Sequence, residues 1–266
     1  MKNESLKNIA IKELLLQLAD DDFIHSYRGA EWLGLAPHIE EDVASASISQ
    51  DTMGHAAIYY KLLDELGEGD ADKLAHDRPA KERRNAIILE LVNGPGYYMK
   101  DPDYDWAFAV VRNYFYTQAK AIKVQSLHSC SYEPLSEVAQ KVQMELYYHL
   151  MHWKTWFVQL LGSGHLEAVS RMQAAIGKTM PDFAGVFSLG QYGEEMVELG
   201  LIEGEADLQK KWIEAITPIF ESVGLATTIE IGMARGDGRN GQHTEDLEKA
   251  LETLSEVYAA DKAASW

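Results

Sequence analysis

Two short segments of the sequence pair a carboxylate with a histidine at a spacing of four residues. The first segment contains Asp51 and His55, and the second contains Glu145 and His149. Residues four positions apart lie on the same side of an α-helix, so each pair could present an oxygen and an imidazole nitrogen to one metal ion. Facing helices that supply such groups build the di-iron centres of four-helix bundles. The two segments therefore predict a metal centre, or its remains, between helices.

The positions that a working di-iron centre needs are filled by other residues. The usual motif is Glu-x-x-His, and its glutamate positions are occupied here by Thr52 and Leu146. Two further helices should each supply a glutamate, yet the sequence has no Asp or Glu between Asp105 and Glu133. The inward candidates in that segment, such as Thr117 and Gln118, are neutral. We therefore expect no metal, catalytic or cofactor-binding residue in this chain.

Two interpretations of the four remaining residues stay open. In the first, Asp51, His55, Glu145 and His149 are buried polar remnants that hydrogen-bond one another across the bundle. In the second, they hold one or two ions in a divergent metal-dependent oxidase, because a four-residue spacing can still chelate a metal. The missing carboxylates favour the first interpretation.

The elements that would position these residues are helices. Apolar residues recur at helical spacing over most of the sequence, and no alternating run of β-branched residues predicts a sheet. The expected helices cover residues 5–34, 38–66, 105–131, 134–161, 165–176, 181–199, 206–233 and 244–260. Short links around Pro37 and Pro134 predict two antiparallel hairpins, and residues 67–104 form a long crossover between them. This is the ferritin-like topology, so we predict one all-α domain over residues 1–266, a ferritin-like four-helix bundle with additional C-terminal helices.

Composition and charge exclude several classes of partner. The formal net charge of −18 argues against nucleic acid and against an anionic membrane surface, since both need a basic face. The single cysteine, Cys130, allows no disulfide within the chain. We see neither the apolar core of a signal peptide nor the roughly 18 apolar residues of a membrane span. The expected location is the cytoplasm.

The glycine-rich segment 232–241 predicts a surface loop before the last helix. Thr244 follows it and suits the N-cap position of that helix. Arg239 and His243 flank the end of the loop and could contact a ligand or a partner.

Several segments, in order along the chain, carry a specific resemblance. They are residues 29–37 (Gly-Ala-Glu-Trp-Leu-Gly-x-Ala-Pro), 68–70 (Glu-Gly-Asp), 148–150 (Tyr-His-Leu), 241–247 (Gly-Gln-His-Thr-Glu-x-Leu) and the terminal Trp266. Their order and spacing extend over essentially the whole sequence. On these residues the chain resembles the structural (C) subunits of the ring-1,2-phenylacetyl-CoA epoxidases, a family of multicomponent di-iron monooxygenases.

The resemblance implies a function that depends on partners. The catalytic subunit is similar to residues 50–55 of this chain but has Glu at the position of Thr52. That subunit would hold the di-iron centre and the coenzyme-A substrate, while a reductase subunit with FAD and an iron–sulfur centre would deliver electrons from NADPH. This chain would support the catalytic subunit in a heteromeric core, and would pair with itself when alone.

Overall fold

The chain folds into helices joined by loops, in a computed structural model that describes residues 2–263, with side chains from residue 4 onwards. These residues contain ten α-helices and four short 3-10 helices. They form no strand, and their one isolated bridge joins Tyr97 to Lys100. The predicted all-α fold class is confirmed. Of the helices in the described part, none combines the length and the apolar character that a membrane crossing needs.

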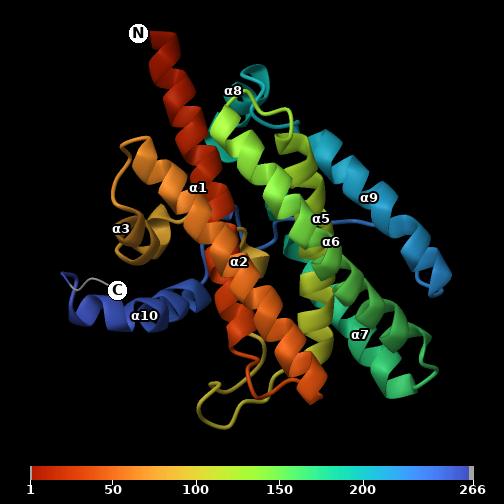
Figure 1. The fold of residues 1–266 in the computed structure, drawn as a ribbon. Helices are drawn as coiled ribbons and strands as arrows, with labels where there is room; N and C mark the ends of the chain where they lie inside the picture. Colours follow the sequence, from red (N-terminus) through yellow and green to blue (C-terminus); the bar gives the residue numbers. More distant parts are fainter. Residues whose placement is uncertain (1, 264–266) are drawn as a thin grey trace. The chain divides into compact units, whose positions relative to one another are not determined.

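Four long helices form the two predicted hairpins (Figure 1). They are α1 (Lys2–Ala30), α2 (Ile39–Glu65), α5 (Trp106–Leu127) and α6 (Glu133–Gly162). The first ends at Ala30 rather than at Gly34. There the N–H groups of Trp32 and Leu33 bond to carbonyl groups three residues earlier, at 3.1 Å, and Gly34 then turns the chain at φ +78°. The order of hairpin, crossover and hairpin is that of the ferritin-like topology.

The remaining helices are shorter, and two differ from their predicted extents. In the crossover lie α3 (Ala71–His76), η1 (Ala80–Glu82) and α4 (Ile87–Glu90); after α6 come α7 (Leu166–Thr179), η2 (Met180–Val186), η3 (Gly190–Tyr192), α8 (Gly193–Glu198), α9 (Glu205–Ser222), η4 (Gly238–Asn240) and α10 (Glu245–Ala260). The expected helix 181–199 is divided, because Gly190 adopts φ +68°. The expected helix 206–233 ends at Ser222, ahead of Gly224 at φ +72°.

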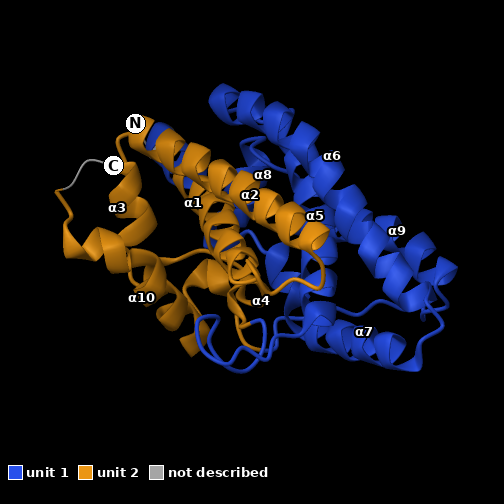
Figure 2. Cartoon of the chain, turned by 60° about the horizontal axis from the view of Figure 1, so that its bottom comes forward, with its two compact units in different colours: residues 1–11, 93–234 blue, residues 12–92, 235–266 orange. Residues whose placement is uncertain are grey.

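The described chain divides into two compact units (Figure 2). Unit 1 comprises residues 1–11 and 93–234, and unit 2 comprises residues 12–92 and 235–266. Unit 1 contains the hairpin of α5 and α6 together with the start of α1, and unit 2 contains the rest of α1 with α2; each unit is described below by itself. The single domain predicted over residues 1–266 stays a prediction.

In unit 2, side-chain contacts show that α1 and α2 are antiparallel. The Tyr60 hydroxyl donates a hydrogen bond of 2.6 Å to Asp20. Further along α1, the Ser26 hydroxyl lies 3.7 Å from the Met53 sulfur. Near the end of α1, Gly29 faces Ser49 so closely that an added Cβ would collide with the Ser49 hydroxyl. The partner numbers fall along α2 as those on α1 rise, which is the pattern of an antiparallel hairpin.

In unit 1, the hairpin of α5 and α6 packs around an aromatic core together with η2 and α9. Phe115 on α5 lies against Phe157, Phe183, Trp212 and Phe220, with ring centroids between 5.4 and 5.9 Å apart. The Trp212 indole N–H donates to the Phe115 carbonyl at 3.1 Å, so its one polar atom is satisfied. Each buried ring of this kind contributes about 1.5–3 kcal/mol of apolar burial. This core fixes the inward face of α6.

The glycine-rich segment 232–241 is a loop before α10 with mostly exposed or half-buried residues, as the sequence predicts, but two of its residues are buried. Gly238 and Arg239 are buried, and Gly238 lies against the crossover in unit 2. A Cβ built on Gly238 would overlap the Asn85 carbonyl oxygen. Glycine is therefore required there for a close backbone approach, which a sequence pattern of turn residues does not reveal.

Replacing Gly238 by Ala tests this close approach. The added methyl group would push the segment off Asn85, so we expect the variant to lose about 2–3 kcal/mol of unfolding free energy in urea titrations. Gly177→Ala is the matched control, since no atom lies within 4 Å of the added Cβ on α7. It should gain about 0.5–1 kcal/mol from helix propensity. Equal midpoints for the two variants would contradict the packing described here.

Candidate functional site

In unit 2, the helical face around His55 lacks the carboxylate that a ligand motif needs. His55 and Thr52 are both buried on α2, whereas Asp51 is partly exposed. The buried position three residues before the histidine thus belongs to Thr52. Its hydroxyl donates a hydrogen bond of 2.7 Å to the Ile48 carbonyl, one turn earlier in the same helix. This hydroxyl is satisfied locally and has no anionic character to offer a metal.

In unit 1, the corresponding face of α6 is apolar around His149. The buried stripe of this helix runs through Val142, Leu146, His149 and Trp153. Glu145 lies off the stripe and is exposed. A spacing of four residues leaves two side chains about 40° apart around the helix, and here that angle separates solvent from the interior. The expected pairing of Glu145 with His149 on one buried face is wrong.

The helix α5 supplies buried cations in place of carboxylates. Arg112, Lys120 and Lys123 are all buried on this helix. The Lys123 ammonium donates to the Val186 carbonyl at 3.2 Å, and the Arg112 guanidinium donates to Asn93. Thr117, an inward candidate from the sequence, is buried as well. The helix carries no Asp or Glu, so it offers no anionic ligand.

Neither α2 nor α6 thus buries a carboxylate beside its candidate histidine. A di-iron centre takes carboxylates from four helices and imidazole from two. Within residues 2–263 no group of three or more His, Cys, Asp or Glu side chains is arranged to hold a metal ion. Asp51 and His55 belong to unit 2, and Glu145 and His149 belong to unit 1.

The most concentrated polar chemistry of unit 2 lies elsewhere, around two buried aspartates of α1. Asp20 is fully buried and accepts hydrogen bonds from the Tyr60 hydroxyl at 2.6 Å, from Arg78 at 3.0 Å and from the Arg84 N–H at 2.8 Å. Arg83, also fully buried, approaches the same carboxylate at 3.3 Å. The Arg residues come from the crossover, which is thereby fixed to the middle of α1.

Asp21 forms a second ion pair with a distant part of the sequence. Its two oxygens accept from the Arg239 guanidinium at 2.7 and 2.8 Å, in the bidentate geometry that suits these two groups. The Ala86 N–H donates to the same carboxylate at 2.8 Å. Asp21 thus joins α1, the crossover and the segment before α10.

A third buried carboxylate, Glu90, completes this ionic network. It accepts from the Asn85 amide at 2.8 Å and from the Thr244 N–H at 2.6 Å, and one oxygen lies 2.8 Å from His243 Nδ1. Arg28 donates to the Glu90 carbonyl at 2.7 and 2.9 Å. Thr244 occupies the predicted N-cap position of α10, but its hydroxyl makes no capping hydrogen bond.

Arg239 and His243 are therefore internal residues, and the expectation that they contact a ligand or partner is wrong. Arg239 is engaged by Asp21, and the His243 imidazole lies between the Glu90 carboxylate and the Arg83 carbonyl, 3.1 Å from the latter. The sequence signal that could have indicated this role was the presence of adjacent acids in the middle of an otherwise apolar helix. Their partners, 58 to 218 positions away, had no comparable signal.

The charges around Asp20 shift its protonation. Burial raises the pKa of this carboxyl. The positive charges of Arg78 and Arg83, together with the hydrogen bonds from Arg78 and Tyr60, lower the pKa by more than burial raises it. The net effect is a pKa of about 2, against an ordinary value of 3.8. Burial and the neighbouring Asp20 charge likewise hold the pKa of Tyr60 well above its ordinary value. At neutral pH Asp20 is thus ionised and Tyr60 is protonated.

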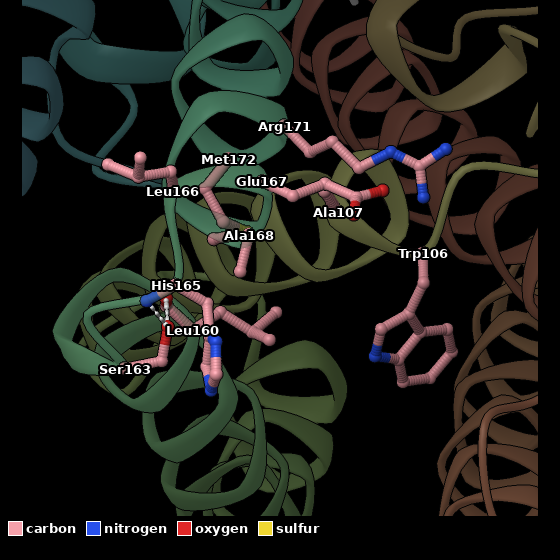
Figure 3. Close-up of a pocket in the computed structure, with 10 residues that line it drawn as sticks. All are labelled: Trp106, Ala107, Leu160, Ser163, His165, Leu166, Glu167, Ala168, Arg171 and Met172. Atoms are coloured by element: carbon pink, nitrogen blue, oxygen red, sulfur yellow. Dashed lines mark hydrogen bonds between the residues drawn. The ribbon is translucent and has the colours of Figure 1, made fainter.

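Unit 1 also contains a recess of about 490 Å³ where the start of α5 meets α7 and the end of α6 (Figure 3). Its lining residues are Trp106, Ala107, Leu160, Ser163, His165, Leu166, Glu167, Ala168, Arg171 and Met172. Figure 3 shows the hydrogen bond of 3.2 Å from the His165 N–H to the Ser163 hydroxyl. The charged side chains Glu167 and Arg171 are exposed, and Ala107 and Met172 are buried. A ligand site would need convergent buried polar groups, so we assign the recess no ligand.

Comparison with known proteins gives one consistent result. The profile of the family described as "Phenylacetic acid catabolic protein" matches residues 2–266. The C subunit of the 1,2-phenylacetyl-CoA epoxidase of Escherichia coli (strain K12) is 27% identical over 252 residues, which cover 94% of this chain and 97% of that protein. The resemblance inferred from short segments of the sequence is confirmed over nearly its full length.

The pKa of Asp20 predicts a specific acid dependence of stability. A group whose pKa is lowered by folding contributes stability above its unfolded value, and loses this contribution as the pH falls through the folded value. We expect about 2 kcal/mol of unfolding free energy to disappear between pH 4 and pH 2. Asp20→Asn should lack this component and should lose about 3–5 kcal/mol at pH 7, because buried arginines then remain unpaired.

Urea titrations from pH 7 to pH 2 measure both effects. The control is Asp64→Asn, an exposed acid on α2, which should stay within about 0.5 kcal/mol of the wild type. An Asp20→Asn protein with wild-type stability at pH 7 would show that the network does not hold unit 2 together.

Proposed function

This chain belongs to the family of phenylacetic acid catabolic proteins, and on that premise we propose that it is a non-catalytic structural subunit of a multicomponent phenylacetyl-CoA epoxidase. In this role it supports the di-iron catalytic subunit in aerobic phenylacetate catabolism. The similarity to the C subunit of the Escherichia coli enzyme supports the assignment, since it spans nearly the whole of both chains. The proposed site of action is the cytoplasm.

The observation that carries the proposal is the identity of the buried residues at the ligand positions. Thr52 and Leu146 stand one helical turn before the two histidines, and neither can supply a negative charge. On α5 the buried polar side chains include Lys120 and Lys123, and the helix has no carboxylate. A chain with this interior can keep the helical architecture of a di-iron protein while leaving the metal to a relative.

In the proposed complex, the chemistry belongs to the partners. The catalytic subunit holds the di-iron centre and the coenzyme-A thioester, and a reductase subunit with FAD and an iron–sulfur centre supplies electrons from NADPH. This chain contributes rigidity. Its aromatic core in unit 1 and its ionic network in unit 2 fix long helices that a partner can pack against without reorganising them.

The alternative is a divergent metal-dependent oxidase that uses Asp51, His55, Glu145 and His149. Four such groups could bind an ion only if all of them faced one site. The exposure of Glu145, beside a buried His149, weighs against that arrangement. The two functions differ in metal content and in their need for a partner, so both can be tested together.

Co-expression with the catalytic subunit of the epoxidase from the same genome tests the proposal. We expect the two chains to co-purify, with iron confined to the catalytic subunit and fewer than about 0.2 metal ions on this chain when it is purified alone. Elemental analysis and size-exclusion chromatography provide the two readouts. About two irons per isolated chain, or no complex with the catalytic subunit, would refute the proposed function.

Replacing His55 and His149 by Ala separates the two functions through activity. If the chain is structural, the double variant should retain the epoxidase activity of the assembled complex and lose about 2–4 kcal/mol of stability, because two buried polar groups are removed. His165→Ala, an exposed position, is the control and should change neither quantity. Loss of bound metal together with loss of activity would instead favour the oxidase.

A further inference from the structure

The outward side of α6 carries an apolar face that points away from the core of unit 1. Met144, Tyr147, Tyr148 and Met151 lie at positions i, i+3, i+4 and i+7, so they line up along one side of the helix. Each of these side chains is between 53% and 67% exposed. The two tyrosine rings are in edge-to-face contact, with centroids 5.3 Å apart. We name these four residues the α6 face.

The α6 face is too large to be explained as scattered surface residues. A tyrosine can bury 150–250 Å², so four side chains of similar size at these exposures present roughly 400–600 Å². The largest apolar patches of monomeric proteins have about this area and are often functional. A standard interface buries about 800 Å² on each partner, of which the α6 face would supply half or more. Tyrosine and methionine are also enriched in such contacts.

The surface beside the α6 face is hollowed. A recess of about 730 Å³ lies between the end of α5 and the first half of α6, and it shares Met144 with the face. Its other lining residues are His128, Glu137, Gln140, Lys141 and Gln143. A ridge of large apolar side chains next to a recess can interlock with the side chains of another helix.

Two lysines bracket the α6 face on a chain that is otherwise strongly acidic. Lys141 lies three residues before Met144, and Lys154 lies three residues after Met151; both are exposed. Glu145 is exposed at one edge between them. Basic residues are a minority here, with 24 Lys and Arg against 42 Asp and Glu. The face therefore offers an apolar centre with an exposed lysine at each end, and the exposed Glu137 lies one turn before Lys141. The two lysines complement carboxylates on a facing surface.

This arrangement disfavours a second copy of the chain as the occupant. The α6 face is symmetric about the midpoint of Tyr147 and Tyr148, so a twofold, antiparallel pairing would centre there. Such a pairing brings Lys141 of one copy level with Lys154 of the other, at both ends of the contact. It also brings together two chains with a net charge of −18 each. Both effects oppose self-association through this surface.

We propose that the α6 face docks a helix of a different protein, whose apolar stripe is bordered by carboxylates that meet Lys141 and Lys154. The inference rests on the proposed function, under which that protein is the catalytic subunit of the epoxidase. The Tyr147 and Tyr148 rings form the centre of the contact, and the two lysines set its register along the helix. The recess beside Met144 receives a side chain of the partner.

The experiment compares binding of variants to the purified catalytic subunit by titration calorimetry. Tyr147→Ser combined with Tyr148→Ser should weaken binding about 100-fold or more, as expected for aromatic residues at an interface centre. Lys141→Glu combined with Lys154→Glu should weaken it about tenfold at low salt, with a smaller effect at high salt. Leu166→Ser, at the most exposed large apolar residue of unit 1, is the matched control and should stay within twofold of the wild type.

The outcomes separate this inference from the proposed function. If the wild type binds and the tyrosine double variant binds equally well, the docking surface is wrong and the proposed function stands. If the wild type itself does not bind, the proposed function fails and the inference fails with it. Sedimentation velocity of the isolated chain tests whether the α6 face binds a second copy of the chain. A dimer that the tyrosine changes dissociate, without weakening the binding of the catalytic subunit, would also overturn the inference. Unfolding midpoints of the variants should match the wild type, because all the replaced side chains are exposed.

Discussion

Burial of Asp20 and Asp21, two of three consecutive buried aspartates in the middle of α1, is the constraint on which unit 2 depends. An unpaired carboxylate in a protein interior would cost several kcal/mol, so Asp20 and Asp21 require cations. The cations come from segments with little regular structure of their own, Arg78 and Arg83 in the crossover and Arg239 in the segment before α10. Residues far apart in the sequence are thereby brought to one helix. The directional geometry of the ion pairs fixes them there more specifically than apolar packing could.

In unit 1, apolar contacts hold together segments that are far apart in the sequence. The rings from α6, η2 and α9 that surround Phe115 carry one polar atom, the Trp212 indole N–H, which donates to the Phe115 carbonyl. Such a core tolerates variation in side chains while keeping helices in place. The buried residues of α6 pack on the inward side of the helix. The tyrosines and methionines of this helix lie on its other side and are exposed. The packing of the core thus determines which residues α6 offers to a partner.

In the proposed structural subunit, His55 and His149 mark the positions at which a di-iron relative would hold its metal. His55 and His149 are still buried at helical positions that suit metal ligands. One turn earlier, Thr52 satisfies its hydroxyl within its own helix and Leu146 packs as an apolar residue. Both side chains are compatible with helix packing, and neither supplies the negative charge of a glutamate. In the proposed structural subunit, selection would act on the stability and shape of the bundle.

The sequence by itself determined the all-α class, the two hairpins, the long crossover and the family, because helical periodicity and ordered motifs are local properties. It also identified Thr52 and Leu146 at the ligand positions. Only the tertiary structure decided which side of α6 Glu145 faces, because a rotation of about 40° separates it from His149. It alone paired Asp21 with Arg239 and placed Gly238 against Asn85. These contacts join residues up to 218 positions apart, and no local pattern encodes a partner at that distance.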